Sequence, residues 1–366
     1  MTVINIGIVG LGSQMQENLL PTLLQMPNVR IVAVCDISAA SAARIHHFIP
    51  NVPITDSIDG MLSLASPDAL VLACPPQAHR DIALQAMESG IHVFVEKPPC
   101  FTLAELEKLV RESRRSRVVT GVGMNFKFAK PVQQLRAITQ SEQFGRTLHI
   151  QLNHYASKPR APMWGLDSTL RSFLLAQAIH TIDLGITFGG DELTGIQSRV
   201  QRHDDSLIVN ADLLFSSGAT ASLLCGTMFP YFEFDMKLVS SNSTMVQLDN
   251  LWNITLHETD HGTRPTGAGK RWRGAWQPGP LDSGYERSGY YGELFSFFDA
   301  IRRQAPFEAS FESLLPTYRV IEQICTDDLL DAAAPQTFSA VPSLDVRRDN
   351  CGILANNNLG AGSNVI

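Results

Sequence analysis

The chain has 366 residues, of which 44% are hydrophobic and 18% charged, a composition typical of a folded globular protein and not of a disordered one. This length exceeds what one hydrophobic core usually supports, so we expect two domains. The formal net charge of −7 gives no support to nucleic-acid binding, which normally requires a basic surface. No apolar run approaches the roughly 20 residues that span a bilayer, and no export signal precedes the first predicted strand, so we expect no membrane association and a cytoplasmic protein.

The six cysteines are scattered along the chain, without a C-x-x-C pair and without the spacing of zinc ligands. We therefore expect reduced thiols and no metal site.

Strands and helices alternate in short steps up to about residue 125. The predicted strands are 4–9, 30–35, 69–73, 91–95 and 118–122, and the predicted helices are 14–25, 39–47, 77–89 and 102–114. This order predicts a mostly parallel, doubly wound α/β sheet with right-handed crossovers. Pro75 and Pro76 cannot continue a central strand, so the chain should leave the sheet there, at the carboxyl edge where nucleotides bind.

The pattern changes after residue 126. One long apolar helix is predicted at 169–188, followed by alternating runs that indicate an antiparallel sheet, at 194–203, 206–215, 219–228, 232–240 and 244–249. The segment 259–289 is rich in Gly, Pro, Arg and Trp and is predicted to be a long loop, with helices after it at 290–303 and 311–330. The expected division is a first domain at 1–125, a second at 126–332 and an extended tail at 333–366.

The run Ile6–Met15 reads as a strand that turns sharply into a helix. Gly10 permits the tight turn, Gly12 lets the backbone approach a pyrophosphate, and the helix that follows directs its free N–H groups at that anion. Met15 stands where the fingerprint has its third glycine, so helix and strand should pack slightly further apart. Asp36 lies 21 residues beyond Met15, near the spacing expected for the acid that binds the adenosine ribose. The alternative is a βαβ unit with a solvated aspartate.

Several further motifs occur in an order that resembles one family. They are Gly10-Leu-Gly12, Asp36, Cys74-Pro-Pro-Gln-Ala-His79, His92-Val-Phe-Val-Glu96-Lys97-Pro98, Gly123-Met-Asn125-Phe-Lys127-Phe and His180-Thr-Ile-Asp183. Over roughly residues 3–330 the chain resembles the glucose–fructose oxidoreductase/inositol dehydrogenase/MocA family. The resemblance implies an N-terminal Rossmann domain, a C-terminal α/β domain on an open, mostly antiparallel sheet, bound NAD(H) or NADP(H), and oxidoreductase chemistry on a sugar, cyclitol or related compound. It also implies a homodimer or homotetramer.

The resemblance assigns site residues by position. Cofactor contacts are implied for Gly10, Leu11, Gly12, Ser13, Gln14, Met15, Asp36, Cys74, Pro75, Pro76, His79, Glu96, Lys97 and Asn125. Substrate contacts are implied for Lys97, Asn125, Arg160, Trp164, His180 and Tyr291. Core packing is an alternative for Tyr291, and a solvated loop is an alternative for the segment around Arg160 and Trp164.

Lys97 and His180 are the expected catalytic residues. Hydride transfer at a carbinol carbon must be matched by a proton on its oxygen, and a lysine beside the nicotinamide can hold that oxygen and exchange the proton. His180 lies on the apolar predicted helix, where the alternative is a buried core histidine. Many members of the family carry Asp four residues before this histidine, whereas this chain has Ala176. Asp183 is expected to orient His180 or to belong to a local network.

Asp36 favours NAD over NADP, because its carboxylate accepts from a ribose 2′-hydroxyl and repels a 2′-phosphate. Two alternatives to a dehydrogenase with net turnover stay open at this point. One is a nucleotide-binding sensor that has lost turnover, for which Ala176 is the main support. The other is a redox-neutral enzyme that holds its NAD tightly.

Overall fold

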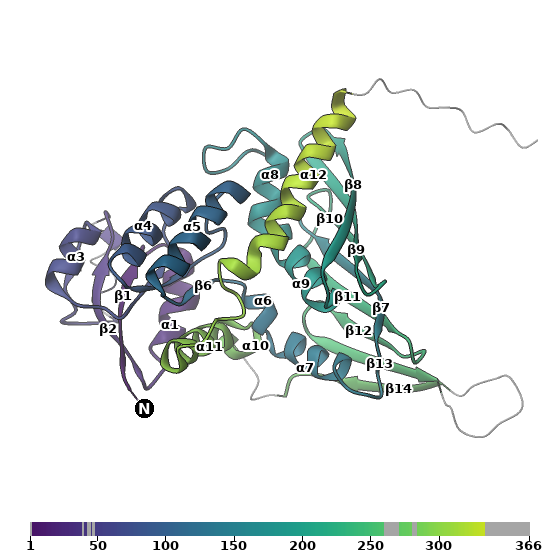
Figure 1. Ribbon diagram of the computed structural model, residues 1–366, viewed down its shortest axis with the longest axis horizontal. Helices are drawn as coiled ribbons and strands as arrows, with labels where there is room; N and C mark the ends of the chain where they lie inside the picture. Colours follow the sequence, from purple (N-terminus) through teal and green to yellow (C-terminus); the bar gives the residue numbers. More distant parts are fainter. Residues whose placement is uncertain are drawn as a thin grey trace, which may run out of the picture.

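The computed structural model describes residues 2–38, 40–41, 45, 48–259, 271–279 and 284–333, with the main chain alone at 259, 271–273 and 331–333. Two sheets lie side by side, each with its own helices (Figure 1). The α/β class predicted from the sequence is confirmed. None of the described helices is long and apolar enough to cross a membrane.

The first sheet is parallel and has the strand order β3-β2-β1-β4-β5-β6. Its strands are β1 (Ile4–Val9), β2 (Val29–Cys35), β3 (Ile54–Thr55), β4 (Ala69–Leu72), β5 (His92–Val95) and β6 (Thr120–Val122). Its helical segments are η1 (Met15–Leu19), α1 (Leu20–Leu23), α3 (Ile58–Leu64), α4 (Pro76–Glu88) and α5 (Leu103–Ser116). The order is that of a Rossmann sheet, with β1 and β4 at the point where the direction of winding reverses. The sequence missed β3 and α3, and most of the predicted helix 39–47 lies outside the described residues.

Local sequence explains where these elements begin and end. β4 is buried at every position, as expected for a central parallel strand, and Pro75 and Pro76 end it and open α4 as predicted. Thr102 and Glu105 form a reciprocal capping box that starts α5. Met15 is fully buried and opens η1, a π-type turn, directly after the glycine loop.

The second sheet is mostly antiparallel, with the order β14-β13-β12-β11-β7-β10-β9-β8, and only β7 and β10 run parallel among the described strands. Its strands are β7 (Thr147–Tyr155), β8 (Leu193–His203), β9 (Ser206–Phe215), β10 (Thr220–Gly226), β11 (Glu233–Ser240), β12 (Met245–Asp249), β13 (Asn253–Thr259) and β14 (Arg271–Trp276). The helical segments are α6 (Asn125–Phe128), α7 (Lys130–Thr139), α8 (Thr169–Phe173), η2 (Leu174–Ala178), α9 (Ile179–Gly189), α10 (Gly284–Arg287), α11 (Tyr290–Arg303), η3 (Glu312–Leu314) and α12 (Leu315–Ala333).

The prediction of a long loop at 259–289 is wrong where β14 and α10 lie. The sequence Arg-Trp-Arg-Gly-Ala-Trp of β14 alternates with period two, and glycine and proline on both sides obscured that pattern. The sequence also missed β7, although its buried and exposed positions alternate. The predicted tail at 333–366 lies outside the described residues except for its first residue, where α12 ends.

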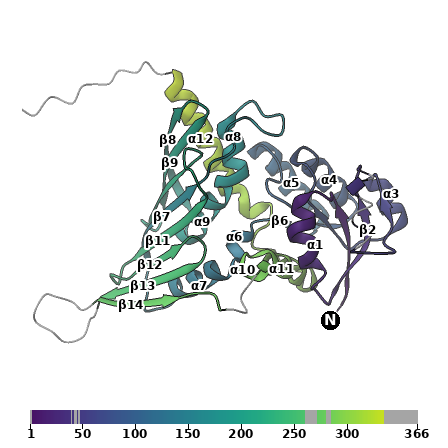
Figure 2. The same cartoon turned by 180° about the vertical axis from the view of Figure 1, so that it is seen from behind.

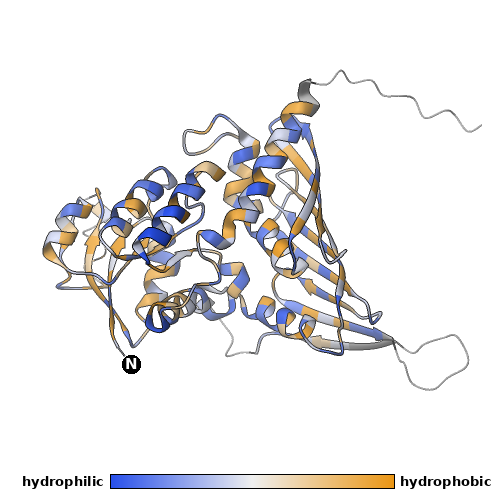
Figure 3. Ribbon diagram, in the orientation of Figure 1, coloured by the Kyte–Doolittle hydropathy of each residue, from blue (hydrophilic) through white to orange (hydrophobic). Residues whose placement is uncertain are grey.

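Helices α7, α9 and α12 pack on the face of the second sheet that is turned toward the first sheet (Figure 2). Along β9, buried and exposed residues alternate, and the hydropathy of the strands alternates accordingly (Figure 3). One face of this sheet therefore belongs to the core, and the other is free of helices in the described part of the chain.

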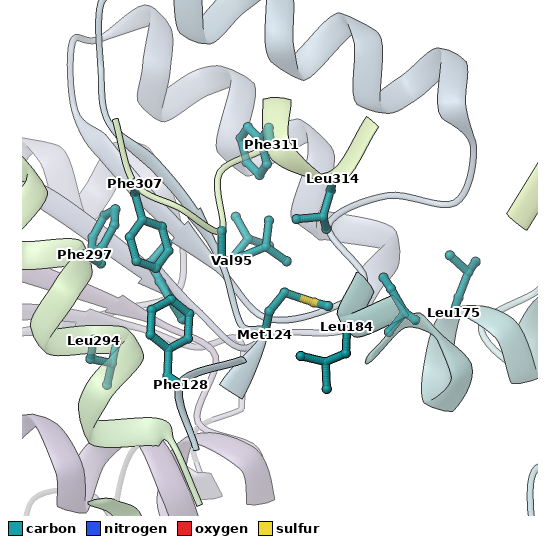
Figure 4. Close-up of a cluster of buried hydrophobic side chains, with 14 of the residues drawn as sticks. Val95, Met124, Phe128, Leu175, Leu184, Leu294, Phe297, Phe307, Phe311 and Leu314 are labelled. Carbon is teal, nitrogen blue, oxygen red and sulfur yellow. The ribbon is translucent and has the colours of Figure 1, made fainter. Parts of the chain in front are cut away.

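One hydrophobic core joins the two halves. Figure 4 shows Val95 from the first sheet and Leu184 from α9 in one cluster with side chains of α11 and the segment before α12. Phe94 packs edge-on against Phe297 with ring centroids 5.5 Å apart. A hydrogen bond of 2.7 Å from the Tyr318 hydroxyl to the Cys100 carbonyl adds a buried polar contact.

Candidate functional site

A pocket of about 340 Å³ lies where the carboxyl ends of β4, β5 and β6 face the second half of the chain. It is lined by Gln14, Ala73, Cys74, Pro76, His79, Glu96, Lys97, Asn125, Phe126, Trp164, Gln177, His180 and Tyr290. Nine of these are residues that the sequence analysis assigned to the site. Ligands of doubly wound sheets bind at this edge.

A second cavity, of about 600 Å³, lies near the amino ends of β5 and β6, beside His92 and Thr120. It is the larger of the two, but it lies at the edge opposite to the glycine loop and does not include Lys97 or His180. We therefore take the smaller pocket as the candidate site.

Glu96 and Lys97 follow the last residue of β5, Val95, and both line the pocket. The Lys97 Nζ donates a hydrogen bond of 2.7 Å to the Ala176 carbonyl oxygen. Burial lowers the pKa of Lys97, and the neighbouring charge of Glu96 opposes that shift only in part. Burial thus moves the pKa of this amine toward the range in which it can exchange a proton.

Glu96, which also lines the pocket, is held by two hydrogen bonds. Its Oε1 accepts from Gln14 Nε2 at 2.8 Å, and its Oε2 accepts from the main-chain N–H of Lys97 at 3.2 Å. A Cβ at Gly123 would lie 2.9 Å from this carboxyl group, so glycine there leaves room for it. Burial raises the pKa of Glu96, while the Gln14 hydrogen bond and the Lys97 charge lower it.

His180 lies in α9 and is 5% exposed. Its ring stacks on Phe126 with centroids 4.3 Å apart, and its Nδ1 has no hydrogen-bond partner in the described structure. Burial first, and then the charges of Lys97 and His154, lower the pKa of His180 well below 6.5. At neutral pH His180 is therefore an uncharged imidazole.

From the sequence, Asp183 is expected either to orient His180 or to belong to a local network, and the structure shows the second. Its Oδ1 accepts from the Lys127 Nζ at 3.0 Å, and both side chains are buried. Burial raises the pKa of Asp183, and the Lys127 charge opposes that rise. Asp183 therefore supports the packing of α9 against α6 and makes no hydrogen bond to His180.

The glycine loop fits a dinucleotide. A Cβ at Gly10 would lie 2.7 Å from the Ala73 carbonyl, so only glycine permits this approach of β1 to the end of β4. A Cβ at Gly12 would meet nothing within 4 Å, which leaves open space beside the loop for a phosphate. Asp36 follows β2, and its Oδ2 accepts from the Leu11 N–H at 2.6 Å, which places the carboxylate beside the loop.

Other predicted site residues lie outside the pocket lining. The side chains of Leu11 and Met15 are fully buried, so only their main chains can face a cofactor. Arg160 is half exposed and pairs with Asp205 at 3.2 Å. Tyr291 stacks on Phe295, while its neighbour Tyr290 lines the pocket. Ser13 and Pro75 likewise do not line it.

The pocket contains residues that the sequence analysis did not single out. Phe126 supports the His180 ring, and its signal was its place directly after Asn125 in the quoted motif. Burial raises the pKa of Tyr290 to about 12, so its phenol stays protonated. Gln177 gave no signal, because its approach to the pocket depends on the phase of the helix.

His154 of β7 lies behind the pocket and is fully buried. Its Nδ1 is 2.9 Å from the Thr181 hydroxyl, its Nε2 has no partner in the described structure, and its ring packs edge-on against Phe232 and Phe234. Burial first, and then the Lys97 charge, lower its pKa from 6.5 to about 4.

This shift predicts acid sensitivity. The imidazole of the unfolded chain binds its proton at a higher pH than the folded one does. The free energy of unfolding is therefore unaffected by His154 protonation above pH 6.5 and decreases as the pH falls toward 4. The loss amounts to about 3 kcal/mol. We expect His154→Gln to lose correspondingly less stability than the natural protein between these pH values, measured by urea unfolding. An equal loss in both proteins would assign the acid sensitivity to other groups.

Comparison with known proteins finds a matching family model for each half of the chain. A family model described as an oxidoreductase family with an NAD-binding Rossmann fold matches residues 4–124, and a model of the GFO/IDH/MocA C-terminal domain matches residues 132–246. A crystal structure of a dehydrogenase from Chromobacterium violaceum is 68% identical, covers 91% of this chain and 97% of its own, and superposes with a TM-score of 0.88.

Two curated relatives are similar over a shorter stretch. Inositol 2-dehydrogenase of Salmonella typhimurium is 28% identical over 177 residues, which is 48% of this chain and 49% of that protein. D-glucoside 3-dehydrogenase of Escherichia coli is 27% identical over 139 residues, which is 38% of this chain and 39% of that protein. The chain therefore matches half or less of the length of these two relatives. The two family models together span most of the described residues, and the chain belongs to the Gfo/Idh/MocA family of NAD-binding oxidoreductases.

Proposed function

We propose that the protein is a dehydrogenase that transfers a hydride between NAD and a carbinol or keto carbon of a sugar, a cyclitol or a sugar derivative. The observation that carries this proposal is that Lys97 and His180, from different halves of the chain, line one pocket at the carboxyl edge of the Rossmann sheet. Two relatives named for inositol and glucoside oxidation support the substrate class.

Lys97 and His180 would act on the substrate oxygen. When bound, NAD supplies the nicotinamide carbon that accepts or donates the hydride. The neutral amine of Lys97 would take the hydroxyl proton as the carbonyl forms, and the uncharged imidazole of His180 would hold the oxygen by a hydrogen bond. Asn125 and Trp164, which line the same pocket, would orient the rest of the ring.

The chemistry is tested by a turnover screen. Purified protein with NAD⁺ or NADP⁺ would be given sugars, cyclitols and nucleotide sugars, and reduced cofactor would be followed by its absorbance. Reduction with a preferred cofactor and a preferred polyol is the expected result. Firm cofactor binding without reduction of any panel member would contradict the proposal and favour a sensor or a redox-neutral enzyme.

We infer that NAD is preferred over NADP because of Asp36. Its carboxylate, held by the main chain of Leu11 and Ser38, would accept from a 2′-hydroxyl and repel a 2′-phosphate. Asp36→Ala should weaken NADH binding several-fold more than NADPH binding, measured by fluorescence titration. Equal losses for the two cofactors would remove Asp36 from ribose recognition.

We also infer that the protein forms a dimer or tetramer through the face of the second sheet that is free of helices in the described structure. Half-exposed apolar side chains lie on this face, among them Leu214 at 39% and Val239 at 38% exposure. Light scattering should give a multiple of the 40.2 kDa chain mass, and Leu214→Lys with Val239→Lys should reduce it. A monomer mass for the natural protein would contradict this inference.

A further inference from the structure

The helix that carries His180 is irregular where it meets Lys97. The helical stretch from Thr169 to Gly189 contains a π-type turn, η2, at Leu174–Ala178. In such a turn the N–H groups bond five residues back instead of four, so the ladder of hydrogen bonds is displaced and a carbonyl becomes available to another donor. The Ala176 carbonyl accepts from the Lys97 Nζ at 2.7 Å.

The hydrogen bond to Ala176 is the one that the Lys97 Nζ makes among the described residues. The nearby Glu96 carboxylate is occupied by Gln14 and by the Lys97 main chain. The other titratable groups around the amine are His180 of α9 and His154 of β7, and both favour their uncharged forms.

We propose that the π-type turn is a positioning device in which the Ala176 carbonyl orients the Lys97 amine toward the pocket. The inference rests on the function proposed above. During oxidation of a carbinol, the substrate O–H bond breaks and an N–H bond forms on Nζ, while the hydride leaves the carbon for the nicotinamide. A carbonyl oxygen accepts a hydrogen bond but cannot take up this proton. The proton therefore stays on Lys97 until it leaves through the pocket, and residue 176 is never part of a relay.

The charge of the acceptor at position 176 also affects the pKa of the lysine. A carboxylate at position 176 would raise the pKa of Lys97, because a neighbouring negative charge favours the ammonium ion. Ala176 is 8% exposed and places only a methyl group there, so its carbonyl aligns the amine without adding a charge beside it. The turn thus orients the base while stabilising its ammonium form less than a carboxylate would.

The carbonyl can be weakened without changing a side chain. Lactic acid in place of residue 177 turns the Ala176 carbonyl into an ester carbonyl, a poorer acceptor, and Gln177→Ala is the amide reference with the same side chain. Lactic acid in place of Ala176 is the matched control, because it alters the Leu175 carbonyl and leaves that of Ala176 an amide.

Two readouts are followed in each protein. The first is the pH dependence of amine labelling at Lys97, followed by mass spectrometry of its peptide, which requires no substrate. We expect the 177 ester, relative to Gln177→Ala, to move the labelling midpoint to lower pH, because the ammonium loses part of its acceptor. The second is kcat, expected to fall about threefold to tenfold while cofactor affinity is unchanged. The 176 ester should leave the midpoint where it was.

A carboxylate introduced at position 176 provides an independent test. Ala176→Asp should move the labelling midpoint upward by about one pH unit or more, whereas Ala176→Asn, of the same shape, should not. Thermal unfolding identifies any variant that fails to fold. In that case the proteins with an ester at position 176 or 177 test the proposal on their own.

Equal midpoints for the 177 ester and its amide reference would overturn the positioning role. Because labelling needs no turnover, a shifted midpoint in a protein without dehydrogenase activity would uphold the contact and refute only the proposed function.

Discussion

Lys97→Ala should lower kcat about 1,000-fold or more and leave the dissociation constant of the cofactor nearly unchanged. The amine lies in the pocket, where burial lowers its pKa, and in the described structure it makes one side-chain hydrogen bond, to Ala176. Alanine removes the group that would exchange the proton and leaves the glycine loop and Asp36 untouched. Steady-state kinetics and cofactor titration on the same preparation separate the two effects.

Lys108→Ala is the matched control, because this lysine is exposed on α5 and forms no ion pair with any of the described residues. It should leave both constants unchanged. Turnover retained in Lys97→Ala would remove Lys97 from the reaction, and loss of cofactor binding to the same degree as kcat would give Lys97 a binding role instead.

Gly289→Ala should destabilise the protein by about 2–5 kcal/mol. The residue precedes α11 with φ +94°, a conformation that disfavours any side chain. A Cβ there would also lie 2.0 Å from the Asn125 carbonyl oxygen and 2.6 Å from the Ala129 nitrogen, both backbone atoms that cannot rotate away. Because Asn125 lines the pocket and donates to the Ser288 carbonyl at 2.9 Å, the displacement should also impair turnover.

Gly218→Ala isolates the contribution of backbone strain. Gly218 has φ +83° in the turn between β9 and β10, and a Cβ there would meet nothing within 4 Å. We expect it to cost only about 1–2 kcal/mol, measured by denaturant unfolding. Equal losses in the two variants would mean that the Cβ at position 289 causes no steric clash with α6.

The sequence predicted the Rossmann half well because its strands are short, buried and separated by helices. Pro75 and Pro76 marked the carboxyl edge of the sheet, and the consecutive residues Glu96 and Lys97 after β5 marked the position of the pocket. In the second half, β7 and β14 were missed, since each lies beside a long glycine- or proline-containing segment that masked a period-two pattern.

Residue types predicted most of the pocket lining, but a contact made by the main chain could not be predicted from the sequence. The absence of a carboxylate at Ala176 suggested an incomplete site, but the acceptor for Lys97 is the main chain of that same residue. A π-type turn has no residue signature, so this contact could not be read from the sequence. Tyr290 and Tyr291 differ by one position at the start of α11, and helix phase alone decides which one lines the pocket.

The measurement that most directly tests the proposed chemistry follows the hydride itself. The polyol preferred in the turnover screen would be supplied with deuterium on the carbon to be oxidised, and the cofactor would be analysed by NMR. We predict deuterium on C4 of the reduced nicotinamide in the natural protein and none above background in Lys97→Ala. Reduced cofactor that carries no deuterium, or labelling that is equal in both proteins, would contradict hydride transfer assisted by Lys97.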